Sequence, residues 1–218
     1  MVKTIIFDLD GTLLNTLGDL NNALNHTLSY FYLPNVTINQ TKSYIGNGVK
    51  KLIERAINGA SIDKDLAYEV FKKYYRNHIK DYTVTYDGIL DLLKVLKENN
   101  INIAIASNKY QEGVEQLTNH LLMPYIDICV GSSEKVKVKP SPDMVNIILK
   151  HFNEEKENCL FVGDSDVDII TGRTNNIKTV GVTWGYKDVD VIKNEGPDYI
   201  INSPLELLEI IKEINNND

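Results

Sequence analysis

Two aspartates stand directly after a short apolar run near the start of the chain. Ile5-Ile6-Phe7 is long enough for one buried strand, and Asp8 and Asp10 follow it, with Gly11 and Thr12 next. Because side chains alternate along a strand, the two carboxylates are expected to point the same way. Like charges side by side repel each other, so such a pair usually requires a cation, a phosphate reaction or both. The simpler alternative is a surface turn in which the acids merely end the strand.

Strands and helices alternate over most of the chain after residue 86. The expected strands are residues 101–106, 126–130, 160–162, 179–182 and 199–201. The expected helices between and after them are residues 87–98, 110–121 and 142–151, a short helix after 160–162, and 204–214. Apolar strands that alternate with helices predict a parallel sheet covered on both faces. The fold class is therefore α/β, with a doubly wound parallel-sheet core.

A stretch with helical periodicity interrupts this pattern after the first strand. Leucines recur there at three- and four-residue spacing, at Leu17, Leu20, Leu24 and Leu28. Further helices are expected at about 47–58 and 64–80, and no convincing strand appears. We expect a small helical domain, residues 15–82, inserted into an α/β domain made of residues 1–14 and 83–218.

The net charge limits the kinds of ligand that the protein can be expected to bind. The formal net charge of −7 argues against a nucleic-acid-binding protein, which needs a basic face. It does not exclude an anionic substrate, because a metal ion and a few local donors can outweigh a distant acidic surface. No apolar run approaches a membrane span, and Cys129 and Cys159 have no CxxC partner. We expect a cytoplasmic protein with buried free thiols, no membrane partner and no nucleic-acid partner.

Polar residues follow several of the expected strands. Ligands of a doubly wound sheet bind outside the carboxyl ends of its strands, so these residues are candidates for a site. They are Asp8, Asp10, Gly11 and Thr12 after the first strand, Ser107 and Asn108 after 101–106, and Gly163, Asp164, Ser165 and Asp168 after 160–162. Lys137 and Lys139 precede the 142–151 helix on the same predicted rim.

This combination of side chains suits phosphoryl transfer. Phosphate oxygens need donors and positive charge, which a hydroxyl, an amide, a lysine and backbone N–H groups supply. A carboxylate nucleophile is repelled by a phosphate dianion unless a divalent ion lies between them, and oxygen ligands without cysteine suit Mg²⁺ rather than zinc. A second carboxyl group must protonate the leaving alkoxide and then help to activate water.

Four segments resemble the motifs of the haloacid dehalogenase superfamily, in order and with suitable spacing. They are Asp8-Leu9-Asp10-Gly11-Thr12, Ser107-Asn108, Lys139-Pro140-Ser141-Pro142-Asp143 and Gly163-Asp164-Ser165-Asp166-Val167-Asp168. The helical insertion is similar to the type-1 cap of that superfamily. Within it, the chain most resembles the phosphoglycolate phosphatases, through 44–49, Ser107-Asn108-Lys109, 164–169 and Val182-Thr183-Trp184-Gly185-Tyr186.

The resemblance implies a role for each motif residue. Asp8 would be the nucleophile that forms an aspartyl-phosphate, and Asp10 the general acid/base. Mg²⁺ would be held by the carboxylates of Asp8 and Asp164 and by the backbone carbonyl of Asp10, with Asp168 as a further ligand or an outer partner. The phosphate-binding groups would be Gly11, Thr12, Ser107, Asn108 and Lys139, with Lys139 preferred over Lys137 because it directly precedes Pro140. The substrate-specificity loop would be Gly46, Asn47 and Gly48.

The expected function is that of a Mg²⁺-dependent phosphomonoester hydrolase for a small phosphorylated metabolite, with 2-phosphoglycolate as the favoured substrate. A nucleotide, pyrophosphate or a sugar phosphate stays open as the substrate, as does a phosphosugar mutase of the same superfamily. A phosphoacceptor signalling domain would also gather acids, a hydroxyl and a lysine at strand ends, and a metal-binding module without chemistry would share the acids. The protein is expected to be a monomer or a homodimer.

Several of these residues could have purely structural roles instead. Thr12 and Asp166 could be residues that start helices. Trp184 and Tyr186 are expected to pack at the rim rather than to form a substrate platform. Lys51 and Arg55 are expected to be solvated on a cap helix.

Overall fold

A six-stranded parallel sheet forms the centre of the protein. The computed structural model describes residues 1–217. The strand order is β5-β4-β1-β6-β7-β8, and every neighbouring pair is parallel. The strands are β1 (Thr4–Phe7), β4 (Asn102–Tyr110), β5 (Ile128–Ser132), β6 (Cys159–Gly163), β7 (Lys178–Val182) and β8 (Tyr199–Ile201). The predicted α/β fold with a doubly wound parallel sheet is confirmed.

The first strand lies where the winding of the sheet reverses. Thr4 is in register with Asn102 of β4 on one side and with Cys159 of β6 on the other. The chain builds β4 and β5 outward on the first side and β6, β7 and β8 on the second. The carboxyl end of β1 is therefore the switch point at which doubly wound sheets bind ligands, and Asp8 is the next residue.

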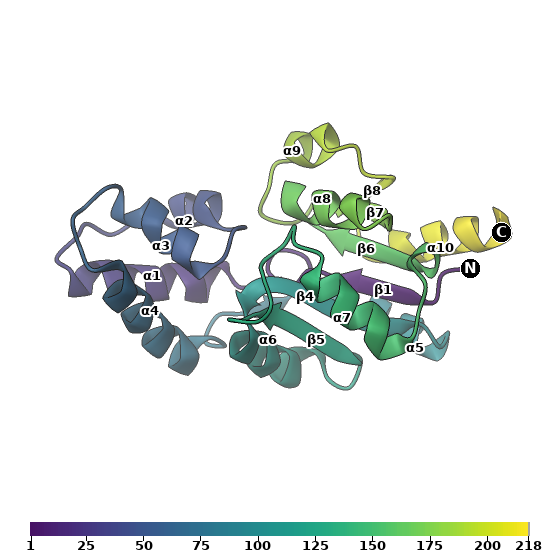
Figure 1. Cartoon of the computed structure of the whole chain (residues 1–218), viewed down its shortest axis with the longest axis horizontal. Coiled ribbons are helices and arrows are strands. Elements are labelled where there is room, and N and C mark those ends of the chain that lie inside the picture. The colour runs from purple at the N-terminus through teal and green to yellow at the C-terminus, as the bar shows by residue number, and fades with distance from the viewer. Residues whose placement is uncertain (218) are drawn as a thin grey trace.

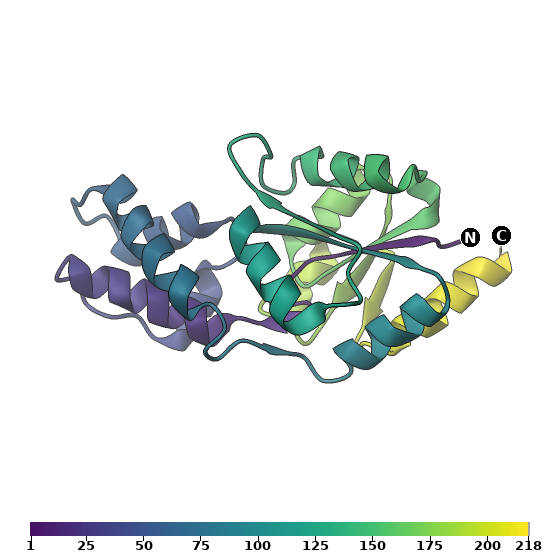
Figure 2. The ribbon, with the colours of Figure 1, turned by 90° about the horizontal axis from the view of Figure 1, so that it is seen from below.

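Helices cover both faces of this sheet. Ile5 and Phe7 of β1 belong to one apolar cluster, and Ile6 belongs to a second, because alternate side chains leave a strand on opposite faces. The first cluster includes side chains of α5 (Ile89–Glu98), α6 (Gln111–Leu117) and α10 (Glu206–Asn217), and the second includes side chains of α7 (Asp143–Phe152). Figure 2 shows α7 on one side of the sheet and α5 and α10 on the other. Helix α8 (Asp166–Thr174) packs on β6 and β7.

The insertion forms a group of helices beside the sheet, at the end opposite to the two termini (Figure 1). It consists of α1 (Leu17–Tyr30), α2 (Ile38–Tyr44), α3 (Val49–Ile57) and α4 (Lys64–His78). Leu20, Leu24 and Leu28 are buried, as their spacing predicted, and they share a cluster with Phe71 and Tyr75 of α4. The inserted helical cap of the predicted fold is thus present.

Some elements differ from the sequence prediction. Helix α2 was not expected, although Thr37 and Gln40 form a capping box at its start. Helix α9 (Val189–Asn194) was also missed, and β4 continues to Tyr110 instead of ending at residue 106. The expected helix 110–121 is α6 followed by a π-helical segment, η1 (Thr118–Leu122), and a 3-10 turn, η2 (Lys156–Asn158), precedes β6.

A two-stranded antiparallel sheet joins the insertion to the core. It pairs β2 (Leu14–Asn15) with β3 (Val84–Thr85), so both connections between the two parts pass through it. Neither strand was predicted, because two-residue strands carry no periodicity.

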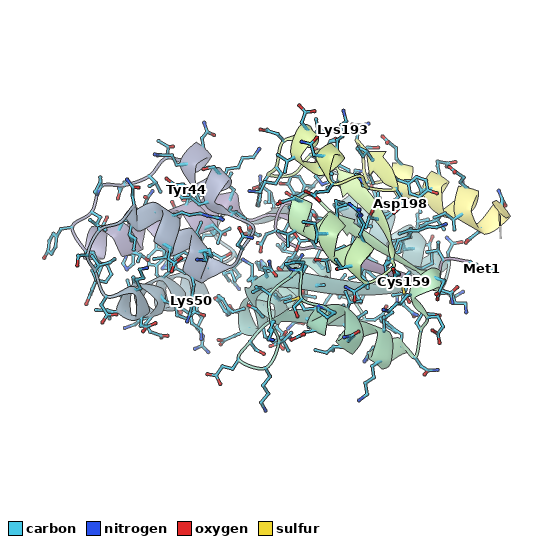
Figure 3. All side chains as sticks on the ribbon, turned by 45° about the horizontal axis from the view of Figure 1, so that its top comes forward. Met1, Tyr44, Lys50, Cys159, Lys193 and Asp198 are labelled. Atoms are coloured by element: carbon cyan, nitrogen blue, oxygen red, sulfur yellow. The ribbon has the colours of Figure 1, made fainter. Side chains whose placement is uncertain are left out.

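The cysteines lie away from the insertion. Both are free thiols; Cys159 is buried as expected, whereas Cys129 is half-buried. Figure 3 shows Cys159 within the core, far from Tyr44 and Lys50 of the insertion. None of the helices within residues 1–217 combines the length and apolar character needed to cross a bilayer.

Candidate active site

Three buried carboxylates meet at the carboxyl ends of β1 and β6. Asp8 follows β1, Asp164 follows β6, and Asp168 lies in the first turn of α8. One oxygen from each carboxylate lies within 4.8 Å of the others. The fold therefore brings together three of the acids that the sequence placed on one rim, from segments more than 150 residues apart.

One lysine neutralises part of this cluster. The Nζ atom of Lys139 lies 2.6 Å from Oδ1 of Asp8 and 2.7 Å from Oδ1 of Asp168. Lys139 is only 3% exposed, whereas Lys137 is an exposed residue. The structure thus brings Lys139 to the acids, and Lys137 stays outside.

The cluster is short of positive charge. Burial raises the pKa of Asp164 to about 7, and the charge of Asp168 adds to this effect. Burial also raises the pKa of Asp8 well above its usual value, although Lys139 opposes the shift. For Lys139, burial alone would lower the pKa, but the carboxylates of Asp168 and Asp8 outweigh it and raise the pKa. Buried oxygen ligands with excess negative charge fit a hard divalent cation such as Mg²⁺.

Asp164 is held in place from two segments. Its Oδ1 accepts a hydrogen bond of 3.3 Å from the hydroxyl of Thr12, and its Oδ2 accepts one of 2.6 Å from the backbone N–H of Tyr186. A Cβ atom added at Gly11 or Gly185 would lie 2.4 Å or 2.2 Å from the Asp164 side chain. Only glycine lets the two loops approach this carboxylate so closely.

The backbone N–H groups of Gly11 and Thr12, which were expected to bind phosphate, donate to carbonyl groups of their own loop. The backbone N–H of Gly11 donates to the carbonyl of Leu14, and that of Thr12 to the carbonyl of Leu9. The positive φ of Gly11, 95°, turns the chain back on itself and creates these bonds. In the structure these two amides are therefore paired within the loop, and phosphate binding by Gly11 and Thr12 stays a prediction. Thr12 does not start a helix either, because α1 begins at Leu17.

The carboxylate of Asp168 already accepts three hydrogen bonds. Its Oδ1 accepts from Lys139, and its Oδ2 accepts from the N–H of Ser165 at 3.1 Å and from the Ser165 hydroxyl at 2.6 Å. The bond from the Ser165 N–H is part of a capping box at the start of α8, where Asp166 is the first helical residue. The helix-start reading of Asp166 agrees with this position.

Ser107 and Asn108 lie within β4 beside the acids. Both are buried, and both line the cavity above the cluster. The amide group of Asn108 accepts from the N–H of Lys139 at 2.6 Å and donates to the carbonyl of Gly46 at 2.9 Å. Asn108 therefore connects the Lys139 segment to the loop of the insertion.

Asp10 does not join the three-carboxylate cluster through its side chain. Its Oδ1 accepts a hydrogen bond of 2.5 Å from the hydroxyl of Thr16 and lies 3.0 Å from Nζ of Lys109. Lys109 also donates to the hydroxyl of Tyr75 at 2.8 Å, and the N–H of Thr16 donates to the hydroxyl of Tyr186 at 2.7 Å. The carboxylate of Asp10 is thus oriented toward the insertion by neighbours that sequence reasoning had not placed in the site.

The rim residues Trp184 and Tyr186 brace the first motif. The indole N–H of Trp184 donates to the carbonyl of Thr12 at 3.0 Å, and Tyr186 contacts Asp164 and Thr16. Packing at the rim was expected for both, yet these specific bonds were not. The sequence signals were their position directly after a strand of the sheet and the family resemblance of residues 182–186.

A small cavity separates the acids from the insertion. Its volume is about 60 Å³, and it is lined on the insertion side by Leu20, Ile45, Gly46, Gly48, Val49 and Leu52. Asn47 does not line it, because its side chain accepts a hydrogen bond of 2.6 Å from Arg55. Lys51 is exposed and pairs with Glu54 at the surface, as expected for a solvated side chain.

Comparison with known proteins agrees with this arrangement. The family model of haloacid dehalogenase-like hydrolases matches residues 5–182. A phosphoglycolate phosphatase of Aquifex aeolicus is 33% identical over 211 residues, which cover 96% of this chain and 97% of that protein. A phosphoglycolate phosphatase of Colwellia psychrerythraea is 31% identical over 219 residues, which cover 96% of this chain and 97% of that protein.

A solved structure is similar over nearly the whole chain. The crystal structure of a candidate phosphoglycolate phosphatase from Lactobacillus delbrueckii subsp. bulgaricus superposes with a TM-score of 0.88 and 30% identity, and the match covers 96% of this chain and 98% of the other. The family match includes the Asp8, Ser107, Lys139 and Asp164 segments, which the fold gathers at one end of the sheet. The chain therefore belongs to the haloacid dehalogenase-like hydrolase family.

Proposed function

We propose that the protein is a Mg²⁺-dependent phosphomonoester hydrolase, with 2-phosphoglycolate as its favoured substrate. The observation that carries the proposal is the buried cluster of Asp8, Asp164 and Asp168 around Lys139 at the switch point of the sheet. The relatives named phosphoglycolate phosphatase support the choice of substrate, because they match this chain over nearly their full length.

The metal would be held by the carboxylates of Asp8 and Asp164 and by the backbone carbonyl of Asp10. Asp168 is assigned as an outer partner, because Lys139 and Ser165 already occupy both of its oxygens. When bound, Mg²⁺ would neutralise negative charge on the nucleophile and on the phosphate. The excess negative charge of the cluster supports this assignment.

In the first half of the reaction, a carboxylate oxygen of Asp8 attacks phosphorus. An oxygen–phosphorus bond forms to Asp8 while the bond to the ester oxygen breaks, and the leaving alkoxide takes a proton from Asp10. The bonds from Thr16 and Lys109 fix the carboxyl group of Asp10 beside the cavity, so no large rearrangement is needed to position it.

In the second half, Asp10 acts as a base. Its carboxylate takes a proton from a water molecule whose oxygen attacks the phosphorus of the aspartyl-phosphate. Inorganic phosphate leaves, the Asp8 carboxylate is restored, and Asp10 is protonated for the next turnover. Ser107, Lys139 and the backbone N–H groups of Leu9 and Asn108 are assigned to the phosphoryl oxygens in both halves.

The insertion is assigned as a cap over the site. We place its bounds at residues 15–82, with residues 1–14 and 83–218 as the core, because β2 and β3 pair at both connections. The cavity beneath it, about 60 Å³, is much smaller than typical ligand pockets of roughly 300–1,000 Å³. This supports a small ester over a nucleotide. A larger cleft of about 950 Å³ adjoins it beyond Gly48 and Asn108, and a bulkier substrate would have to extend there.

Release of inorganic phosphate from a panel of substrates tests the proposal. The panel holds 2-phosphoglycolate, a nucleoside monophosphate, pyrophosphate and a sugar phosphate, each with Mg²⁺ and with excess chelator. We expect the highest kcat/KM for 2-phosphoglycolate and no turnover in chelator. Absence of phosphate release from every substrate would contradict a phosphatase, and isomerisation of the sugar phosphate without release would instead indicate a mutase.

A further inference from the structure

One lysine reaches the cavity from the segment between β7 and α9. Lys187 is half-buried and lines the cavity together with Asp8 and Asp10. A Cβ atom added at Gly46 would lie 3.7 Å from its Cε and 3.9 Å from its Nζ. Lys187 therefore extends from the core to the loop of the insertion, at the boundary between the two parts.

The backbone of this lysine is firmly anchored. The preceding residue, Tyr186, donates its N–H to Asp164 at 2.6 Å, and its hydroxyl accepts from the N–H of Thr16 at 2.7 Å. Asp164 follows β6 at the catalytic end of the sheet and Thr16 precedes α1 at the start of the insertion, so Lys187 begins from a fixed point beside the site. It is not a lysine on an unconstrained surface loop.

Charge balance distinguishes Lys187 from the other two lysines that line the cavity. Lys139 lies between Asp8 and Asp168, and Lys109 lies against Asp10, so acids already neutralise both. Within residues 1–217, Lys187 has no carboxylate within 4.0 Å of its Nζ. It is thus the lining cation whose charge is still available to a ligand.

The remaining lining on the insertion side is mostly apolar. Leu20, Ile45, Val49 and Leu52 offer no donor or positive charge to a substrate. A second anionic group on the substrate, beyond the phosphate, would therefore find its favourable partner at Lys187. A carboxylate carries one negative charge, which a single lysine ammonium group can balance through a charge-assisted hydrogen bond.

We propose that Lys187 is a specificity-determining residue that binds the carboxylate of a small phosphorylated hydroxy acid. The inference rests on the proposed phosphatase function and adds to it the residue that recognises the carboxylate of the favoured substrate. Lys187 spans core and insertion, so the carboxylate would be held where the cap meets the core, away from the reacting phosphorus.

A pair of esters that differ in one group tests this role. In 2-hydroxyethyl phosphate, a hydroxymethyl group replaces the carboxylate of 2-phosphoglycolate. We expect Lys187→Met to lower kcat/KM for 2-phosphoglycolate roughly 10- to 100-fold, the worth of a charge-assisted hydrogen bond, and to leave 2-hydroxyethyl phosphate nearly unaffected. Lys187→Arg keeps the charge and should restore most of the preference.

Lys193 provides the matched control. It is an exposed lysine on α9, six positions along the same segment, and Figure 3 shows it at the outer edge of the core. Lys193→Met should change neither ester. Equal losses on both esters in Lys187→Met would assign Lys187 to holding the cap instead, and an unchanged preference would also overturn the proposal.

A binding measurement separates this inference from the proposed function. Calorimetric titration in an Asp8→Asn background, where the ester is not consumed, compares the Kd of both esters with and without Lys187→Met. The expected result is weaker binding of 2-phosphoglycolate alone. If the wild-type protein hydrolyses neither ester, the phosphatase proposal fails, and this titration still decides the role of Lys187: equal Kd values with and without the lysine would refute it.

Discussion

Nζ of Lys109 donates a hydrogen bond of 2.8 Å to the hydroxyl oxygen of Tyr75, which links the core to the insertion directly behind Asp10. Lys109 follows Ser107 and Asn108 on β4, whereas Tyr75 belongs to α4. Both side chains are buried, and Lys109 also lies 3.0 Å from Oδ1 of Asp10. A helix of the insertion thus contacts the proposed general acid/base through one lysine.

We predict that Lys109→Met lowers kcat with little change in KM. The variant removes a donor that orients Asp10 but leaves the proposed phosphate-binding residues in place. We therefore expect kcat to fall roughly 10-fold or more. Steady-state kinetics on 2-phosphoglycolate measures the split. A rise in KM with unchanged kcat would show that Lys109 serves substrate binding instead.

Tyr75→Phe is expected to destabilise the protein. The change leaves the ammonium group of Lys109 with one partner fewer in a buried place, which typically costs about 1–3 kcal/mol. Urea unfolding compares this variant with Tyr74→Phe, which alters the neighbouring, half-buried residue of the same helix. Equal stability of the two variants would mean that the Tyr75–Lys109 bond adds nothing to folding.

Gly185→Ala is expected to raise the Mg²⁺ concentration at which activity is half-maximal. Its Cβ would lie 2.2 Å from Cβ of Asp164, so the proposed metal-binding carboxylate must move. A Mg²⁺ titration of activity measures the shift. Gly196→Ala, which strains the backbone at a φ of 62° but whose added Cβ meets nothing within 4 Å, controls for a general loss of stability. An unchanged half-saturating Mg²⁺ concentration would contradict the placement of Asp164.

The stability of the metal-free protein should fall as the pH rises from about 4 to 7. Burial raises the pKa of Asp164 to about 7, above its ordinary value of 3.8, so between these values the folded state binds more protons than the unfolded state. Unfolding in chelator at pH 4.5 and at pH 7.5 measures the difference, and Asp164→Asn should reduce it. Added Mg²⁺ should stabilise the protein more at the higher pH, where the carboxylate is charged.

The positions of Asp8, Ser107, Lys139 and Asp164 could be anticipated because the topology of a parallel sheet is simple. Each follows an apolar run of residues or precedes a helix, and the carboxyl ends of parallel strands meet at one edge. The cap helices were also readable, since the periodicity of the leucines in α1 needs no knowledge of tertiary structure.

The residues around Asp10 could not be anticipated in the same way. Tyr75 and Lys109 are 34 positions apart, and Tyr186 and Thr16 are 170 positions apart, so no local pattern joins either pair. The internal hydrogen bonds of Gly11 and Thr12 were not anticipated for a similar reason. Their amide groups were counted as free donors, yet the turn at Gly11 pairs them with carbonyls of the same loop. Helix α2, in contrast, had a readable signal in Thr37 and Gln40 that was overlooked.

Chemical trapping of the phosphorylated residue tests whether Asp8 is the nucleophile. The wild-type protein is mixed with 2-phosphoglycolate and Mg²⁺, quenched in acid within the first turnover and reduced with borohydride, and the modified residue is located by peptide mass spectrometry. We predict modification at Asp8 in the wild-type protein, and neither modification nor phosphate release in a folded Asp8→Asn variant. Modification of another residue, or sustained phosphate release by Asp8→Asn, would contradict this prediction.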